Sequence, residues 1–93
     1  MPAKIKPPTE LPDINDLRGV LAYNIRLHRV RNGLSQEDLA LACGLDRTYV
    51  SAVERSVWNI ALSNVEKVAT ALGIEPWKLL RPPRKVVRNS SRG

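Results

Sequence analysis

The chain has 93 residues, of which 43% are hydrophobic, enough for one small domain with one core and too few for two. With two Trp, two Tyr and no Phe, the core has to be built from Leu, Val, Ile and Ala, a composition that favours packed helices. One cysteine excludes an internal disulfide, and one histidine argues against a zinc site, so we expect neither a metal nor another cofactor.

The net charge of +6 is unevenly distributed along the chain. Residues 1–15 are neutral overall, residues 16–80 carry +1 and residues 81–93 carry +5, so the total charge says little about the central segment. No apolar run approaches the roughly 20 residues that span a bilayer, and the N-terminus lacks the apolar stretch of a secretory signal. We therefore expect a cytoplasmic protein without membrane contact, organised as a flexible arm (1–15), a helical domain (16–80) and a basic tail (81–93).

Capping residues and glycines predict two helices in the first half of the domain. Asp16 begins the first, which ends at Asn32 and Gly33. Ser35 begins the second, with Asp38 three residues later in a variant of the capping box. The inward face of the first helix is predicted to hold Leu17, Leu21, Ile25 and His28.

Three more helices are predicted after Gly44, which ends the second. Asp46 begins the third, which runs to about Arg55; the fourth contains residues 63–72; Pro76 begins a short fifth over residues 76–80. Gly44 accepts the left-handed conformation and, like other small residues near it, allows two helices to cross closely, the pattern of a helix-turn-helix. The predicted inward residues of this motif are Leu39, Ala40, Cys43 as a core thiol, Leu45, Val50 and Val53.

The segments "GLSQEDLA", "CGLDRTYVSAVER" and "VEKVATALGI" give the chain, from about residue 20 to residue 80, a clear family likeness. It resembles the phage-repressor and Cro-like (XRE-type) helix-turn-helix family, and most closely the controller proteins of restriction-modification systems. The resemblance implies an all-α fold, a compact five-helix lambda-repressor-like DNA-binding domain. Ser56 departs from the family pattern, which usually has glycine there, and Ile60-Ala61 replaces a common Pro-Ser.

The third helix, residues 46–55, is the expected recognition helix in the major groove. Arg47 can donate two hydrogen bonds to guanine, and Thr48 offers a hydroxyl and a methyl group. For Tyr49 two interpretations stay open, a DNA contact or a ring packed beside the turn. The predicted base contacts are Arg47, Thr48, Tyr49, Ser51 and Ala52, and the predicted phosphate contacts are Gln36 and Arg55.

The resemblance implies further roles outside the recognition helix. Arg29 and Glu54 occupy the positions of a structural ion pair. Glu37 and Asp38 either favour the helix N-terminus electrostatically or form an acidic patch that contacts RNA polymerase. A homodimer interface is expected at Ile74, Trp77, Leu79 and Leu80, with Leu27 and Val30 as a second candidate.

The sequence thus predicts a homodimeric transcriptional regulator that binds double-stranded DNA at a palindromic operator. An alternative is an antitoxin-like or other protein-interaction module that also binds DNA. We do not expect an enzyme, because His28 and Cys43 have no evident orienting partner and no acid–base or nucleophile constellation can be assembled. His28 is expected to be a partly buried packing residue, and the role of Trp58 stays open.

Overall fold

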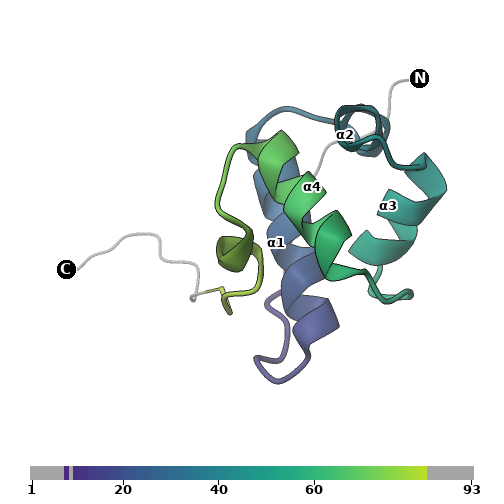
Figure 1. Cartoon of the computed structure of the whole chain (residues 1–93). Coiled ribbons are helices and arrows are strands. Elements are labelled where there is room, and N and C mark those ends of the chain that lie inside the picture. Colours follow the sequence, from purple (N-terminus) through teal and green to yellow (C-terminus); the bar gives the residue numbers. More distant parts are fainter. Residues whose placement is uncertain (1–7, 9, 84–93) are drawn as a thin grey trace.

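The computed structural model describes residue 8 and residues 10–83, and the regular elements of this part are all helical (Figure 1). The elements are α1 (Leu17–Arg31), α2 (Gln36–Cys43), α3 (Arg47–Glu54), α4 (Leu62–Leu72) and a 3-10 helix, η1 (Pro76–Leu79). The prediction of an all-α fold is confirmed, with four α-helices in place of five. The fifth element is a single 3-10 turn because its four residues are held by i to i+3 bonds such as that from Lys78 N to Glu75 O, 3.0 Å.

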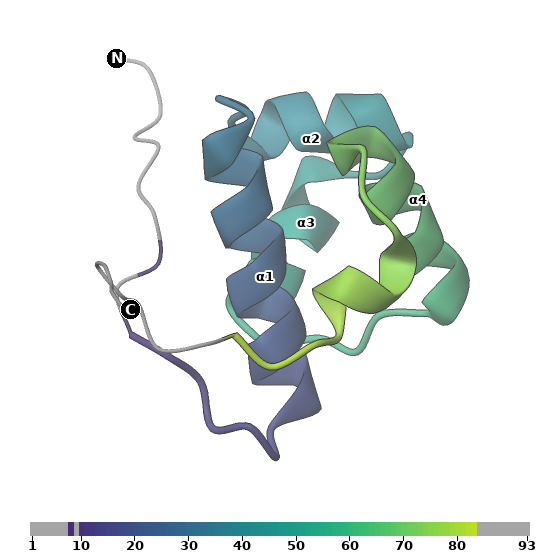
Figure 2. The ribbon, with the colours of Figure 1, turned by 90° about the vertical axis from the view of Figure 1, so that its left-hand side faces the viewer.

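The elements pack around α1 and α4, each of which contacts three other elements, and α4 as well as α1 contacts η1. α1 contacts α3, α4 and η1, while α2 contacts α3 and α4. In Figure 1, α3 and η1 lie on opposite sides of the pair formed by α1 and α4, and Figure 2 shows α2 lying across one end of that pair. This arrangement leaves one side of α3 open to solvent. Among the described residues, no helix has the length and apolar character needed to cross a membrane.

One hydrophobic core joins all the elements. Its buried members are Leu21, Ile25, Leu39, Ala40, Val50, Val53, Val65, Val68, Ala69, Leu72 and Leu79. The predicted core face of α1 is wrong at Leu17, whose side chain is 59% exposed, because the first turn of α1 extends past the elements packed on it (Figure 2). Val20, which the prediction omitted, is fully buried instead.

Asn24 is a buried polar residue that was not predicted from the sequence. Its amide nitrogen donates to the backbone carbonyls of Leu79, at 2.7 Å, and Arg81, at 2.9 Å. Because these carbonyls belong to the end of η1 and the residues after it, Asn24 fixes η1 against α1. The only signal in the sequence was that Asn24 directly precedes Ile25 in a mostly apolar segment.

The four α-helices end in the same way. Each is followed by a residue with a positive φ, at Gly33 (70°), Gly44 (72°), Ser56 (60°) and Gly73 (74°). The next residue then donates its N–H five residues back, in the pairs Leu34–Arg29, Leu45–Ala40, Val57–Ala52 and Ile74–Ala69. This is the Schellman motif, which glycine adopts without steric cost. Ser56, after α3, is the exception among the four.

Candidate nucleic-acid interface

The start of α2 has the predicted capping box. The Ser35 hydroxyl accepts a hydrogen bond from Asp38 N at 3.0 Å, and the Asp38 carboxylate accepts one from Ser35 N at 2.9 Å. The hydrogen bond from Ser35 N to the Asp38 carboxylate, followed by the interaction of that carboxylate with the Ser35 hydroxyl, holds the pKa of Asp38 below its ordinary value. The helix then ends at Gly44, and α3 begins three residues later, so the predicted helix-turn-helix is present.

The first turn of α3 is capped and exposed. The Asp46 carboxylate accepts a hydrogen bond from Thr48 N at 2.8 Å, and the side chains of Arg47 and Thr48 face solvent. Within the described residues, the Arg47 side chain has no hydrogen bond or ion pair. Its guanidinium donors are therefore available to a ligand.

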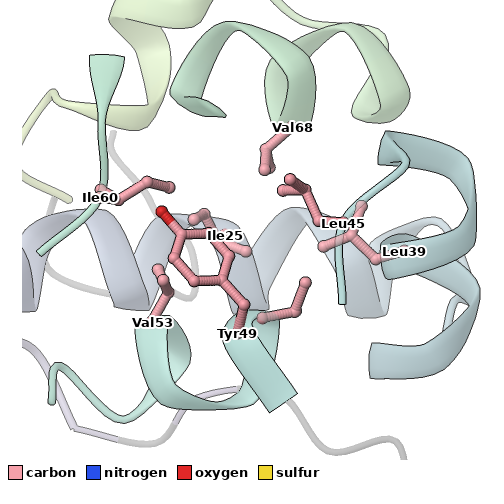
Figure 3. Close-up of a pocket in the computed structure, with 8 residues that line it drawn as sticks. Ile25, Leu39, Leu45, Tyr49, Val53, Ile60 and Val68 are labelled. Atoms are coloured by element: carbon pink, nitrogen blue, oxygen red, sulfur yellow. The ribbon is translucent and has the colours of Figure 1, made fainter. Parts of the chain in front are cut away.

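Tyr49 turns inward from the same turn. Figure 3 shows its ring pointing into the interior toward Ile60, and its hydroxyl accepts a hydrogen bond from Asn64 Nδ2 at 3.1 Å. The ring also lies 6.0 Å from that of Trp58, centroid to centroid. A cavity of only about 10 Å³ remains among the surrounding side chains, so the ring fills the space it occupies. The structure supports the packing interpretation of Tyr49, and a base contact by this half-buried side chain stays a prediction.

α3 has an exposed face and a buried face. Arg47, Ser51 and Arg55 follow one another at four-residue spacing on the exposed or half-exposed side. Ala52 is only 2% exposed, so its predicted base contact is wrong: its position on this short helix faces the interior. The base-contact candidates that remain at the surface are Arg47, Thr48 and Ser51.

The two predicted phosphate contacts border the exposed face. Gln36, half-buried at the start of α2, donates from Nε2 to Glu54 Oε1 at 3.1 Å. Arg55 is exposed, with a long 3.4 Å hydrogen bond from its Nε to the Ser51 carbonyl. Both side chains retain unused N–H groups, and their phosphate contacts stay predictions.

A buried ion pair fixes α3 to α1. Arg29 Nε lies 2.6 Å from Glu54 Oε2, its second terminal nitrogen donates to Glu54 Oε1 at 2.9 Å, and the two side chains are 4% and 3% exposed. The other terminal nitrogen of Arg29 donates to the Leu34 carbonyl at 2.8 Å. The predicted structural ion pair is confirmed, and together with Gln36 it joins α1, α2 and α3.

The predicted dimer residues divide into three environments. Leu79 is fully buried in the core, so its assignment to an interface is wrong. Ile74 and Leu80 are half-buried and pack against the core, as partly covered residues. Trp77 is 55% exposed, with Lys78 Nζ 5.8 Å and Arg81 Cζ 5.4 Å from its ring centre. The second candidates, Leu27 and Val30, are both half-buried.

His28 and Cys43 are both half-buried. Burial lowers the pKa of His28, and the cations of Arg31, Lys78 and Arg81 add to this effect. Burial raises the pKa of the Cys43 thiol, with a smaller opposing effect of Lys67. The predicted packing role of His28 agrees with its position, whereas Cys43 lies at the edge of the core rather than inside it.

These features define a class of protein. The glycine at the end of α2 leads directly to α3. The first turn of α3 is capped and exposed, and a buried ion pair fixes α3 to the domain. This arrangement is a DNA-binding helix-turn-helix. The family described as Helix-turn-helix matches residues 25–76, more than half of the sequence, and the chain belongs to that family.

Several known proteins are similar to this chain. A Neisseria meningitidis protein described as a hypothetical transcription factor is 63% identical over 91 residues, covering 95% of this chain and 86% of that protein. A crystal structure of the hypothetical transcription factor NHTF from Neisseria superposes with a TM-score of 0.84 at 68% identity, covering 86% of this chain and 90% of the other. The predicted likeness to regulators of this type is thereby confirmed.

Two controller proteins of restriction-modification systems are also similar. Control protein C.BamHI from Bacillus amyloliquefaciens is 42% identical over 67 residues, covering 71% of this chain and 83% of that protein. The controller protein C.Esp1396I, solved as a tetramer in complex with its natural 35-base-pair operator, has a TM-score of 0.63 at 32% identity, covering 68% of this chain and 83% of that one. The predicted resemblance to controller proteins is confirmed.

Proposed function

We propose that this protein is a homodimeric transcriptional regulator that recognises a palindromic double-stranded operator in the cytoplasm and carries out no reaction of its own. The observation that supports this most directly is Arg47, whose guanidinium has no partner among the described residues and lies on the exposed first turn of a helix fixed by a buried ion pair. A related controller protein was solved on its operator, which supports the same role here.

In the proposed complex, α3 lies in the major groove. Arg47 donates to O6 and N7 of a guanine, and Thr48 presents its hydroxyl and methyl group to a neighbouring base. Asp46 holds the first turn through the bond to Thr48 N, so both side chains project from a formed helix end. The rigid attachment of α3 lowers the conformational cost of this arrangement, because little of the helix has to become ordered on binding.

Phosphate contacts position the protein without specifying sequence. Gln36 has one N–H committed to Glu54 and a second available for a phosphate oxygen. Because Glu54 also holds Arg29, Gln36 connects a phosphate contact to the ion pair that fixes α3. Arg55, on the exposed face of α3, is the second proposed phosphate contact.

We also propose a contact with RNA polymerase through the acidic first turn of α2. Glu37 and Asp38 are exposed on the first turn of α2. Asp38 already accepts the hydrogen bond from Ser35 N, so Glu37 offers the freer carboxylate to a polymerase subunit. Transcription in a purified system would test this part: Glu37→Gln should reduce activation while leaving operator binding intact.

Two substitutions test the assignment of roles at the DNA surface. Arg47→Ala should relax the preference at one position of each half-site, with a loss of about 1–3 kcal/mol confined to the base that Arg47 contacts. Gln36→Ala should instead weaken binding to all sequences nearly equally. Binding to a panel of operator variants, each with one base pair changed, measures both effects. An unchanged base preference for Arg47→Ala would show that Arg47 does not contact a base.

A further inference from the structure

We infer that an acidic segment of another protein docks on the surface formed by Arg31, Trp77, Lys78 and Arg81, here called the η1 surface. The segment supplies carboxylates for the cations and an apolar side chain for the tryptophan. This inference goes beyond the proposed function, because η1 packs on α1 and α4 and lies on the opposite side of that pair from α3 (Figure 1). A partner can therefore bind there while α3 lies in the groove of its operator.

Trp77 forms the centre of the η1 surface. It is 55% exposed, although Leu79, two residues later, is fully buried in the core. Tryptophan and arginine are among the residues that contribute most often to binding energy at protein–protein interfaces. A single exposed apolar side chain is common on protein surfaces, so the groups around Trp77 decide whether it marks a binding site.

Three cations lie around this tryptophan. Lys78 Nζ is 5.8 Å and Arg81 Cζ is 5.4 Å from the centre of its ring. After burial, the cations of Arg31, Lys78 and Arg81 lower the pKa of His28, so all three lie near one half-buried side chain. Positive charges from the end of α1 and from η1 and the residues after it therefore share one small surface.

Most of this positive charge has no carboxylate partner. Lys78 forms an ion pair with Glu75 at 3.1 Å, whereas within the described part of the chain neither Arg31 nor Arg81 forms an ion pair. Each guanidinium is planar and can bind a carboxylate through two parallel hydrogen bonds. The arrangement of charges therefore favours a ligand that places carboxylates beside these two arginines.

The η1 surface is formed before any partner binds. Asn24 on α1 donates to the carbonyls of Leu79, at 2.7 Å, and Arg81, at 2.9 Å. Leu80 N donates in turn to the Trp77 carbonyl at 3.0 Å. These bonds fix the backbone from Trp77 to Arg81 against α1, so little of this segment has to become ordered when a partner binds.

A protein segment suits this surface better than a nucleic acid does. Bases stack on an open aromatic face, whereas Lys78 and Arg81 both lie over the ring of Trp77. A nucleic-acid backbone also carries a negative charge at every nucleotide, so it would meet the exposed carboxylate of Glu75. A peptide can place its carboxylates at the arginines alone and cover Trp77 with an apolar side chain.

A second copy of this chain is also a poor occupant of the η1 surface. A symmetric contact centred on Trp77 would bring Lys78 and Arg81 of both copies together. Like charges placed opposite each other disfavour association. The occupant that complements both the charge and the apolar centre of this surface is an acidic segment of a different protein.

The test begins with a library of random peptides displayed on phage, selected against the immobilised full chain without DNA. The most enriched peptide is synthesised with a fluorescent label, and its dissociation constant is measured by fluorescence anisotropy. Trp77→Ala and Arg81→Glu alter the η1 surface. Leu41→Ala and Arg18→Glu are the matched controls, because Leu41 on α2 and Arg18 on the first turn of α1 are also exposed. Far-UV circular dichroism checks the folding of each variant.

We expect the enriched peptides to carry a net negative charge and a large apolar side chain. Trp77→Ala and Arg81→Glu should each raise the dissociation constant about tenfold or more, and the two controls should leave it within about twofold. Binding should also weaken as the salt concentration rises, because the charges on this surface are exposed to solvent.

The inference is overturned by a library in which no peptide is enriched, by enriched peptides without net negative charge, or by a peptide that binds both η1-surface variants as tightly as the wild type. A labelled oligothymidine tests the nucleic-acid alternative with the same variants. If binding of this oligonucleotide, and not that of the peptide, depends on Trp77 and Arg81, the surface binds nucleic acid and the inference is wrong. Binding of the wild type to operator DNA is measured separately, so failure of the proposed function is recognised independently.

Discussion

Glu54 accepts hydrogen bonds from two other elements, two from Arg29 on α1 and one from Gln36 on α2. Its carboxylate is almost fully buried, so these bonds replace the water it would otherwise contact. The orientation of α3 relative to the rest of the domain depends on this one side chain more than on any other polar group described. Removal of a partner leaves a buried charge without compensation.

Arg29→Met should therefore lower the free energy of unfolding by about 3–5 kcal/mol. The double variant Arg29→Met, Glu54→Leu should recover part of this loss, because neither buried charge is then left alone. Urea denaturation of Arg29→Met, Glu54→Leu and the double variant measures the three free energies of unfolding. A loss below about 1 kcal/mol in Arg29→Met would show that the pair is not the main attachment of α3.

Individual residues on α3 were predicted with mixed success. The ion pair followed from the family resemblance, and the exposure of Arg47 and Thr48 followed from the cap at Asp46. The burial of Ala52 did not follow, and the inward turn of Tyr49 was one of two open interpretations, because which sides of α3 are covered is decided by how α1 and α2 pack against it. A helical pattern in one segment does not contain that information.

Helix ends are the most regular feature of the domain at the level of its elements. Three of the four Schellman motifs use glycine, and the sequence predicted helix ends at Gly33 and Gly44 and a fourth helix whose last residue, 72, directly precedes Gly73. The fourth uses Ser56, whose φ of 60° places an L-residue in the left-handed region. That conformation costs an ordinary residue about 1–2 kcal/mol, so the end of the recognition helix is held with some strain.

Ser56→Gly should raise the free energy of unfolding by about 0.5–1 kcal/mol. The substitution relieves the backbone strain, and part of that gain is offset because glycine has greater conformational freedom in the unfolded chain. Ser56→Ala is the control, since it keeps the strain and should give no gain. Gly44→Ala is the reverse test, because no atom lies within 4 Å of the added methyl group. The substitution should lower the free energy of unfolding by about 1 kcal/mol through backbone strain alone. Thermal or urea unfolding distinguishes the three, and equal stability of Ser56→Gly and Ser56→Ala would rule out strain at this position.

The elements themselves were predicted well because local signals define them. Asp16, Ser35 and Asp46 cap their helices as expected, with side-chain bonds to backbone N–H groups. The fifth helix was predicted from Pro76 and a short apolar run, and no local signal distinguishes one α-helical turn from a 3-10 turn of that length. The buried bonds from Asn24 to the end of η1 are tertiary contacts, which local patterns do not reveal.

At the scale of the whole molecule, burial and nearby positive charge both affect the pKa of His28 and thereby the stability of the fold. Its side chain lies on the last turns of α1, half-buried, with the cations of Arg31, Lys78 and Arg81 nearby. Desolvation and then these cations lower its pKa from the ordinary value of 6.5, so the unfolded chain takes up a proton before the folded chain does. The contribution of neutral His28 to stability is complete above pH 6.5 and is lost as the pH falls through the interval below it.

Urea unfolding midpoints at pH about 7.5 and about 5 measure this dependence. The wild type should lose stability toward the lower pH, and His28→Gln should lose less, because it cannot take up the proton. Carboxylates such as Asp38, whose pKa is also lowered, titrate at more acidic pH and affect both proteins alike. An identical pH dependence in the two proteins would show that His28 makes no contribution.

The central claim is that this molecule reads DNA sequence through α3 as a two-fold dimer. The most direct test is selection of bound fragments from a random pool of double-stranded DNA by the full chain. We predict enrichment of a palindrome whose half-site centres are one helical turn apart, with a guanine in each half-site that is no longer preferred by Arg47→Ala. A pool in which no sequence is enriched, under conditions where the protein is folded, would contradict sequence-specific recognition.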